Sequence, residues 1–176
     1  MKDKVGQMLQ NKRIKEVIPF VEGYLLDMCC GTNELVKNYQ GRGIGVDIKQ
    51  WGNVDKVVED VAELPFENNT FDTITILASL NYIPNRLETL IDTKRVLKNS
   101  GRLIITMIPP KISKIWHKAR ESWDEDHSEL LMNEGQMYGL TEDDLRKLLS
   151  EAGFKIELKK KFMFGINNLT IAKKSK

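Results

Sequence analysis

Three acidic residues, each placed at the end of a short apolar stretch or just after one, are the best candidates for binding chemistry in this chain. Asp27, Asp47 and Asp60 share this position. Because the carboxyl ends of parallel strands meet at one edge of a sheet, we expect the three carboxylates to converge there. Asp47 could accept hydrogen bonds from two ribose hydroxyls, and Asp60 from an exocyclic amine such as that of adenine. Any one of them could instead cap a helix or face solvent in a turn, but their recurrence favours a nucleotide-like ligand.

Residues 28–33, Met-Cys-Cys-Gly-Thr-Asn, form a turn of mostly small residues directly after Asp27. Gly31 lets a ligand approach the backbone closely. A short helix that begins at Glu34 would present the unpaired N–H groups of its first turn to the same ligand. The turn and the acid before it therefore predict one side of a binding cleft.

At this point the chain resembles the class I S-adenosylmethionine-dependent methyltransferases, from about residue 18 to residue 172. Besides the acid-ended strands, residues 60–66 and 71–77 are similar to the family's third motif and fourth strand. Residues 95–105 resemble the helix, turn and fifth strand that usually read "RVLKPGG" before an apolar run, and residues 141–154 look like the last helix. The resemblance implies an α/β fold with a Rossmann-like, doubly wound, mostly parallel seven-stranded sheet whose last strand is antiparallel.

The resemblance also implies a cofactor and its binding residues. The expected cofactor is S-adenosylmethionine, and residues 1–176 are expected to form a single methyltransferase domain. The expected cofactor contacts lie after the first, second, third and fourth strands: Asp27, Met28, Cys29, Cys30, Gly31, Asn33, Asp47, Ile48, Asp60, Val61, Leu77 and Ala78.

Two positions in the first loop depart from the family pattern. The family usually has glycine where this chain has Cys29 and Asn33. Cysteine is small, and asparagine adopts left-handed backbone more readily than most residues, so the loop can still close around a ligand. Cys29 and Cys30 are the two cysteines of the chain, which excludes a disulfide framework and a recognised metal pattern. We interpret them as small packing residues rather than reactive thiols, although a helix N-terminus would favour a thiolate.

Composition fits one globular, cytoplasmic domain. The 176 residues are 41% hydrophobic and 30% charged, no apolar run approaches a membrane span, and the first residues lack a secretory apolar region. The formal net charge of +2 gives little long-range attraction for nucleic acid. A small-molecule acceptor is therefore favoured and nucleic acid is the less favoured partner, while the pattern leaves the oligomeric state open.

The order of the elements is readable from periodicity. Apolar residues at helical spacing predict a leading helix near residues 14–21, a crossover helix over 87–97 and a last helix over 141–152. Continuous apolar residues from 103 to 108 predict a strand buried on both faces. Residues 154–158 and 169–172 read as two strands whose connection is too short for a crossover helix, so the final strand should be antiparallel to its neighbour.

Residues 111–139 fall where the resembling family carries variable substrate caps. Their apolar residues form one helical stripe, which either covers the core or contacts a substrate. The resemblance implies an in-line transfer of the sulfonium methyl, in which a general base is optional. Candidates for such a base are His127, Asp124 and Tyr138 in the cap and Asn81 and Tyr82 after the fourth strand, and the sequence assigns the catalytic role to none of them. The two histidines, with no recognised ligand spacing, do not predict a metal site.

Two hypotheses follow. The chain is either an active methyltransferase for a small molecule, or a non-catalytic nucleotide-binding module or methyltransferase-like partner subunit. The acid-ended strands and the cap favour the first hypothesis. The second rests on the non-glycine residues of the first loop and on the absence of an identifiable base.

Overall fold

The computed structural model describes residues 4–114 and 139–175, which form a single seven-stranded sheet with helices on both faces. The strand order is β3-β2-β1-β4-β5-β7-β6. The strands are β1 (Leu25–Met28), β2 (Gly43–Asp47), β3 (Lys56–Val57), β4 (Phe71–Leu77), β5 (Leu97–Met107), β6 (Phe154–Phe162) and β7 (Asn167–Lys174). The first five strands are parallel, while β7 is antiparallel to both β5 and β6, which confirms the expected sheet.

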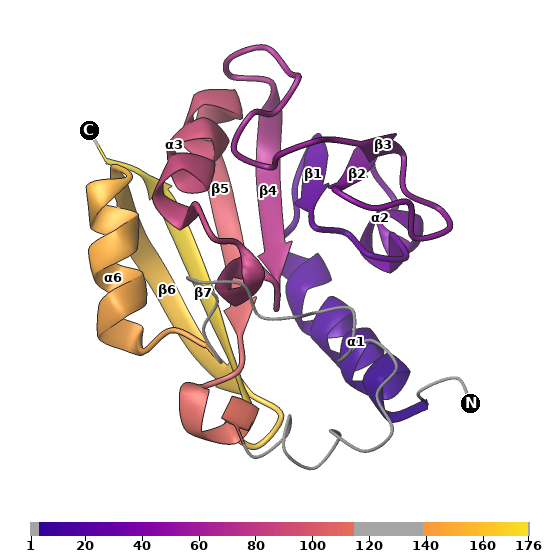
Figure 1. Cartoon of the computed structure of the whole chain (residues 1–176), viewed down its shortest axis with the longest axis vertical. Helices are drawn as coiled ribbons and strands as arrows, with labels where there is room; N and C mark the ends of the chain where they lie inside the picture. Colours follow the sequence, from indigo (N-terminus) through magenta and orange to yellow (C-terminus); the bar gives the residue numbers. More distant parts are fainter. Residues whose placement is uncertain (1–3, 115–138, 176) are drawn as a thin grey trace.

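The helices form two layers around this sheet (Figure 1). Helix α1 (Lys4–Val17) and helix α2 (Glu34–Asn38) share one buried core with the sheet, and α3 (Arg86–Val96) and α6 (Glu142–Glu151) share the other. Successive residues of a strand face opposite sides, so β1 sends Leu26 and Met28 into the α3 layer and leaves Asp27 on the α1 side. The alternation of side chains along β1 therefore determines the face of the sheet on which the Asp27 side chain lies.

The boundaries of two elements differ from the sequence expectation. The leading helix ends at Val17, and Pro19 lies within a 3-10 turn at Ile18–Phe20 rather than in the helix, because proline lacks the N–H that a helix interior needs. Strand β5 begins at Leu97 instead of after Gly101. Its register on β4 jumps between Phe71 and Thr73, so residues 98–101 bulge out of the ladder where the sequence predicted a turn.

The carboxyl-terminal elements follow the sequence closely. Thr141 caps α6 with a complete capping box, in which Thr141 Oγ1 accepts from the Asp144 N–H and the Asp144 carboxylate accepts from the Thr141 N–H. Strands β6 and β7 then form an antiparallel hairpin, as the short connection predicted. Among the described residues no helix combines the length and the apolar character needed to cross a bilayer.

A half-buried arginine fixes the segment that follows β3. Arg95, at the end of α3, donates to the carbonyl oxygens of Leu64 and Phe66 at 2.8 and 2.7 Å and pairs with Asp92 at 2.6 Å. This clamp ties residues 64–66 to α3, and the Asn85 amide at the start of α3 holds the third acidic residue, Asp60, at 2.7 Å. The cap candidates Asp124, His127 and Tyr138, and most of the expected cap, lie outside the described residues.

Candidate cofactor site

The loop after β1 takes a left-handed backbone conformation at alternate residues. The φ angles are 54° at Cys29, 55° at Gly31 and 62° at Asn33. Two of these three residues are the ones that occupy the family's usual glycine positions. The loop therefore keeps the shape of a glycine-rich turn although only one of the three is glycine, at an expected cost of about 1 to 3 kcal/mol for each non-glycine residue.

Asp27 lies in β1, just before this turn, and its side chain is buried on the α1 side of the sheet. It is 3% exposed, and the Thr75 hydroxyl on the neighbouring strand β4 donates to its Oδ1 at 2.6 Å. Burial raises the pKa of Asp27 to about 7, the Thr75 hydrogen bond opposes that rise, and the nearby Asp47 carboxylate adds to it. A cation brought into this position would favour the ionised carboxylate.

Asp47 ends β2 and holds the loop from the opposite side. Its carboxylate accepts from the backbone N–H of Gly31 at 2.9 Å and from that of Lys49 at 3.3 Å. Each carboxylate oxygen keeps further lone pairs, so Asp47 can still accept from ribose hydroxyls. The next residue, Ile48, is 61% exposed and offers an apolar surface beside this acid.

The Asn33 side chain points away from the loop and into the β2 side of the sheet. Its amide nitrogen donates to Asp55 at 2.8 Å and to the carbonyl of Asn53 at 2.9 Å, and Asp55 also accepts from the Gly45 N–H at 2.7 Å. A methyl group at Gly45 would overlap the Asn33 amide, because a Cβ there would collide with its Oδ1. Any contact of Asn33 with a cofactor would come from its backbone.

Three other expected cofactor residues have partners within the protein. Both oxygens of Asp60 are hydrogen-bonded, to the Ala62 N–H at 2.8 Å and the Asn85 amide at 2.7 Å. Val61 is buried in the α3-side core, and so is Met28, whose sulfur accepts from the Thr93 hydroxyl at 3.4 Å. Contacts of Met28 and Val61 with a cofactor would be made by their backbones, and the role of Asp60 toward adenine stays a prediction.

Both cysteines are held as neutral thiols. Burial is the largest cause that raises the pKa of Cys29, to about 12, and it also raises the pKa of Cys30, with the carboxylates of Asp27 and Asp47 adding to both shifts. A thiolate is therefore disfavoured in this loop despite the helix that follows. This environment agrees with our interpretation of the two cysteines as small packing residues rather than reactive thiols.

A cavity of about 110 Å³ opens between this loop and α1. Loop, strand and helix residues line it: Gln10, Arg13, Ile14, Asp27, Cys29, Cys30, Gly31, Leu35 and Leu77. The structure thus brings together five of the predicted site residues, namely Asp27, Cys29, Cys30, Gly31 and Leu77.

Sequence reasoning missed the contribution of α1, above all that of Arg13. The available signal was a cation directly before Ile14, the first residue of the helix's apolar stripe. The Nε of Arg13 is buried and finds no hydrogen-bond partner in the part of the chain that the structure describes. Burial lowers the pKa of this guanidinium, and Tyr82 acts in the opposite direction.

The end of β4 closes the cavity at the sheet edge. Ala78, the residue after Leu77, has a φ of 55° and donates its N–H to the Thr106 carbonyl at 2.8 Å. Of the two base candidates beyond this strand, Asn81 is buried and its carbonyl accepts from Arg86 at 2.9 Å, and Tyr82 lies in the 3-10 turn Leu80–Tyr82. Neither observation assigns a catalytic role to Asn81 or Tyr82.

Comparison with known proteins decides the family. The methyltransferase domain family matches residues 7–159, which is most of the chain. This chain belongs to that family. The sheet order and the solved neighbours agree with the class I methyltransferase fold that the sequence resemblance implied.

The names of curated relatives of this methyltransferase refer to menaquinone and ubiquinone. A demethylmenaquinone methyltransferase of Staphylococcus saprophyticus is 26% identical over 73% of this chain and 69% of its own length. A ubiquinone/menaquinone biosynthesis C-methyltransferase of Pseudomonas savastanoi pv. phaseolicola is 28% identical over 65% of this chain. The match spans only half of the Pseudomonas protein.

Solved structures share the fold at low identity. A putative methyltransferase of Haloferax volcanii, solved in complex with the Trm112 methyltransferase activator, has a TM-score of 0.75 at 14% identity, covering 97% of this chain and 92% of that one. A possible histamine N-methyltransferase of Thermotoga maritima has a TM-score of 0.73 at 15% identity, covering 93% and 88%. These likenesses support the architecture alone.

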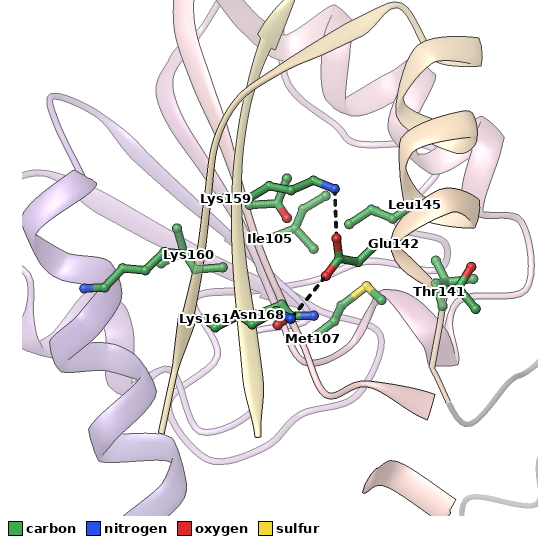
Figure 2. Close-up of a pocket in the computed structure, with 12 residues that line it drawn as sticks. Ile105, Met107, Thr141, Glu142, Leu145, Lys159, Lys160, Lys161 and Asn168 are labelled. Carbon is green, nitrogen blue, oxygen red and sulfur yellow. Dashed lines mark hydrogen bonds and ion pairs between the residues drawn. The ribbon is translucent and has the colours of Figure 1, made fainter. Parts of the chain in front are cut away.

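This methyltransferase has a second hollow, of about 210 Å³, on the α6 side of the sheet (Figure 2). Ile105 and Met107 of β5 are among its apolar residues, and Glu142 lies between Lys159 and Lys161 at 3.4 and 4.0 Å. Asp27 faces the opposite side of the sheet, so this hollow is separate from the candidate cofactor site. Exposed ion pairs of this kind contribute at most about 1 kcal/mol to stability.

Proposed function

We propose that this chain binds S-adenosylmethionine between Asp27 and Asp47 and transfers its methyl group to a small-molecule acceptor. The observation that carries the proposal is the buried Asp27 carboxylate, which faces a cavity beside a turn of glycine-like geometry. A buried acid with a single hydroxyl partner fits a cationic ligand better than a structural role.

The residues present fit this cofactor at three places. Asp27 offers a carboxylate to the ammonium group of the amino-acid end, Asp47 offers carboxylate oxygens to a ribose, and Ile48 offers an exposed apolar face to a base. The cofactor supplies the electrophilic methyl group when it is bound. The protein's own contribution is to hold acceptor and methyl in line, an effect of up to ~7 to 11 kcal/mol in favourable intramolecular systems.

A quinone-like ring is the acceptor class that we would test first. The proposal draws on the names of the Staphylococcus and Pseudomonas relatives, which describe methylation of quinones and, for Pseudomonas, transfer to carbon. The net charge of +2 keeps nucleic acid the less favoured partner. A cytoplasmic location and a single-domain organisation stay predictions from the sequence.

The proposal is tested by incubating the chain with methyl-labelled S-adenosylmethionine and either a demethylated quinone or a metabolite extract. Labelled product that depends on the chain supports methyl transfer, and the Asp47→Ala variant should form less of it at limiting cofactor. Isothermal titration with S-adenosylmethionine tests the first step by itself. A chain that shows no binding heat at millimolar cofactor contradicts the proposal.

A partner subunit is the second candidate function. The Haloferax neighbour was solved with an activator protein, which favours testing whether this chain also needs one. Binding of cofactor with no turnover across broad extracts, followed by turnover when extract proteins are added back, would favour this candidate. Turnover by the purified chain would exclude it.

A further inference from the structure

We propose that Arg13 binds the carboxylate of the cofactor's amino-acid end and makes the site selective for ligands that carry that group. The inference rests on the proposed function, since it names one residue and one ligand group of the same site. Nothing in the loop motifs points to Arg13, which lies on α1, 12 positions before the first residue of β1.

Arg13 is held at the cavity by the packing of its helix. The neighbouring Ile14 and, one turn on, Val17 are buried in the core shared by α1 and the sheet. These anchors fix the face of α1 that Arg13 occupies, and its side chain lines the same cavity as Asp27 and Gly31. The guanidinium is therefore presented to the cavity by a buried helix face.

Among residues 4–114 and 139–175 no carboxylate forms an ion pair with this guanidinium, although Asp27 lines the same cavity. Its Nε is buried without a hydrogen-bond partner, and the groups that shift the neighbouring acid, Asp27, are Thr75 and Asp47 rather than Arg13. A buried donor without a partner destabilises the protein, and more so when it is charged. A ligand carboxylate would remove that cost, because the planar guanidinium matches two carboxylate oxygens.

The cavity thus contains two groups of opposite charge, Asp27 and Arg13, which do not form an ion pair with each other. Asp27 suits a cation and Arg13 suits an anion, which together complement an amino acid in its zwitterionic form. The volume of about 110 Å³ suits the amino-acid end of the cofactor, while the ribose and base would extend along Asp47 and the exposed Ile48.

The test compares two ligands that differ only in this carboxylate. S-adenosylhomocysteine and its decarboxylated form, S-adenosyl-3-thiopropylamine, are titrated calorimetrically into the unaltered chain, Arg13→Met and Arg13→Lys. The unaltered chain should bind S-adenosylhomocysteine about 10- to 100-fold more tightly than the decarboxylated compound. In Arg13→Met this preference should fall to less than about 3-fold, and Arg13→Lys should keep part of it.

Lys15→Met is the matched control, because Lys15 is an exposed cation of the same helix and does not line the cavity. It should keep the full preference, which separates local recognition from the general loss of a positive charge. A thermal melt of each variant checks its folding, and the two-ligand comparison in the unaltered chain needs no variant at all.

The possible failures are distinguishable. Equal affinity of the unaltered chain for both compounds overturns the inference about the carboxylate and leaves the proposed function standing. A preference that survives in folded Arg13→Met assigns the carboxylate to another residue and also overturns it. An unaltered chain that binds neither compound overturns the proposed function and this inference together.

Discussion

Gly31 donates its backbone N–H to the Asp47 carboxylate across 2.9 Å, so the loop after the first strand is tied to the end of the second. The two residues are 16 positions apart in the sequence. This hydrogen bond gives Asp47 a structural role in ordering the loop besides its proposed role toward a ribose. Both roles bear on what replacement of the residue should do.

Replacing Asp47 with alanine should weaken S-adenosylmethionine binding by roughly 1.5 to 3 kcal/mol, because it removes charge-assisted hydrogen bonds. Isothermal titration measures the change. Glu59→Ala is the matched control, since Glu59 is an exposed acid near the end of the third strand, and it should bind like the unaltered chain. Unchanged affinity in folded Asp47→Ala would remove the residue from the site.

Asp27 should make the stability of the ligand-free chain fall as pH rises from about 4 to 7. Burial raises the pKa of Asp27 from 3.8 to about 7 in the folded chain. In that window the folded state keeps a proton that the unfolded state has lost, so the free energy of unfolding decreases with pH, by roughly 4 kcal/mol at most, and levels off above 7.

Asp27→Asn removes this titration and gives the measurement. Urea unfolding at pH 4.5 and pH 8 should show the variant gaining stability relative to the unaltered chain at pH 8 and losing most of that advantage at pH 4.5. The same variant should bind S-adenosylmethionine more weakly. A stability difference that does not change with pH would contradict the raised pKa of Asp27.

The left-handed backbone at Cys29 should discriminate between substitutions. Cys29→Val places a β-branched side chain at a φ of 54° and should lower the free energy of unfolding by about 1 to 3 kcal/mol. Cys29→Gly relieves the backbone strain and should be the more stable of the two variants, which urea unfolding will measure. A valine variant as stable as the glycine variant would argue against this loop geometry.

The contact of Gly45 with the Asn33 amide should appear as coupling between the two positions. Gly45→Ala should destabilise the chain by about 1 to 3 kcal/mol, since a Cβ there overlaps Asn33. In the Asn33→Gly background the same substitution should cost clearly less, because the overlapping amide is gone. Urea unfolding of the four variants in this cycle measures the coupling, and additive costs would show that the two residues do not touch.

The sequence by itself determined the order of the elements and the acids that end the strands. Alternating apolar periodicities, the small-residue turn after Asp27 and the short final hairpin depend on local spacing, so they were readable without coordinates. The same local logic failed at β5, where residues 98–101 read as a turn but bulge from a strand that pairs again at Arg102.

Only the tertiary structure decided which side chains share one cavity. The sequence placed Asn33 beside Asp27 in the binding loop, whereas the fold turns the Asn33 side chain toward Asp55 and brings in Arg13 from a helix before the sheet. Burial of Asp27, and with it the raised pKa, likewise results from α1 packing across the end of β1. Contacts between elements distant in sequence depend on how those elements pack, and local residue patterns do not encode that packing.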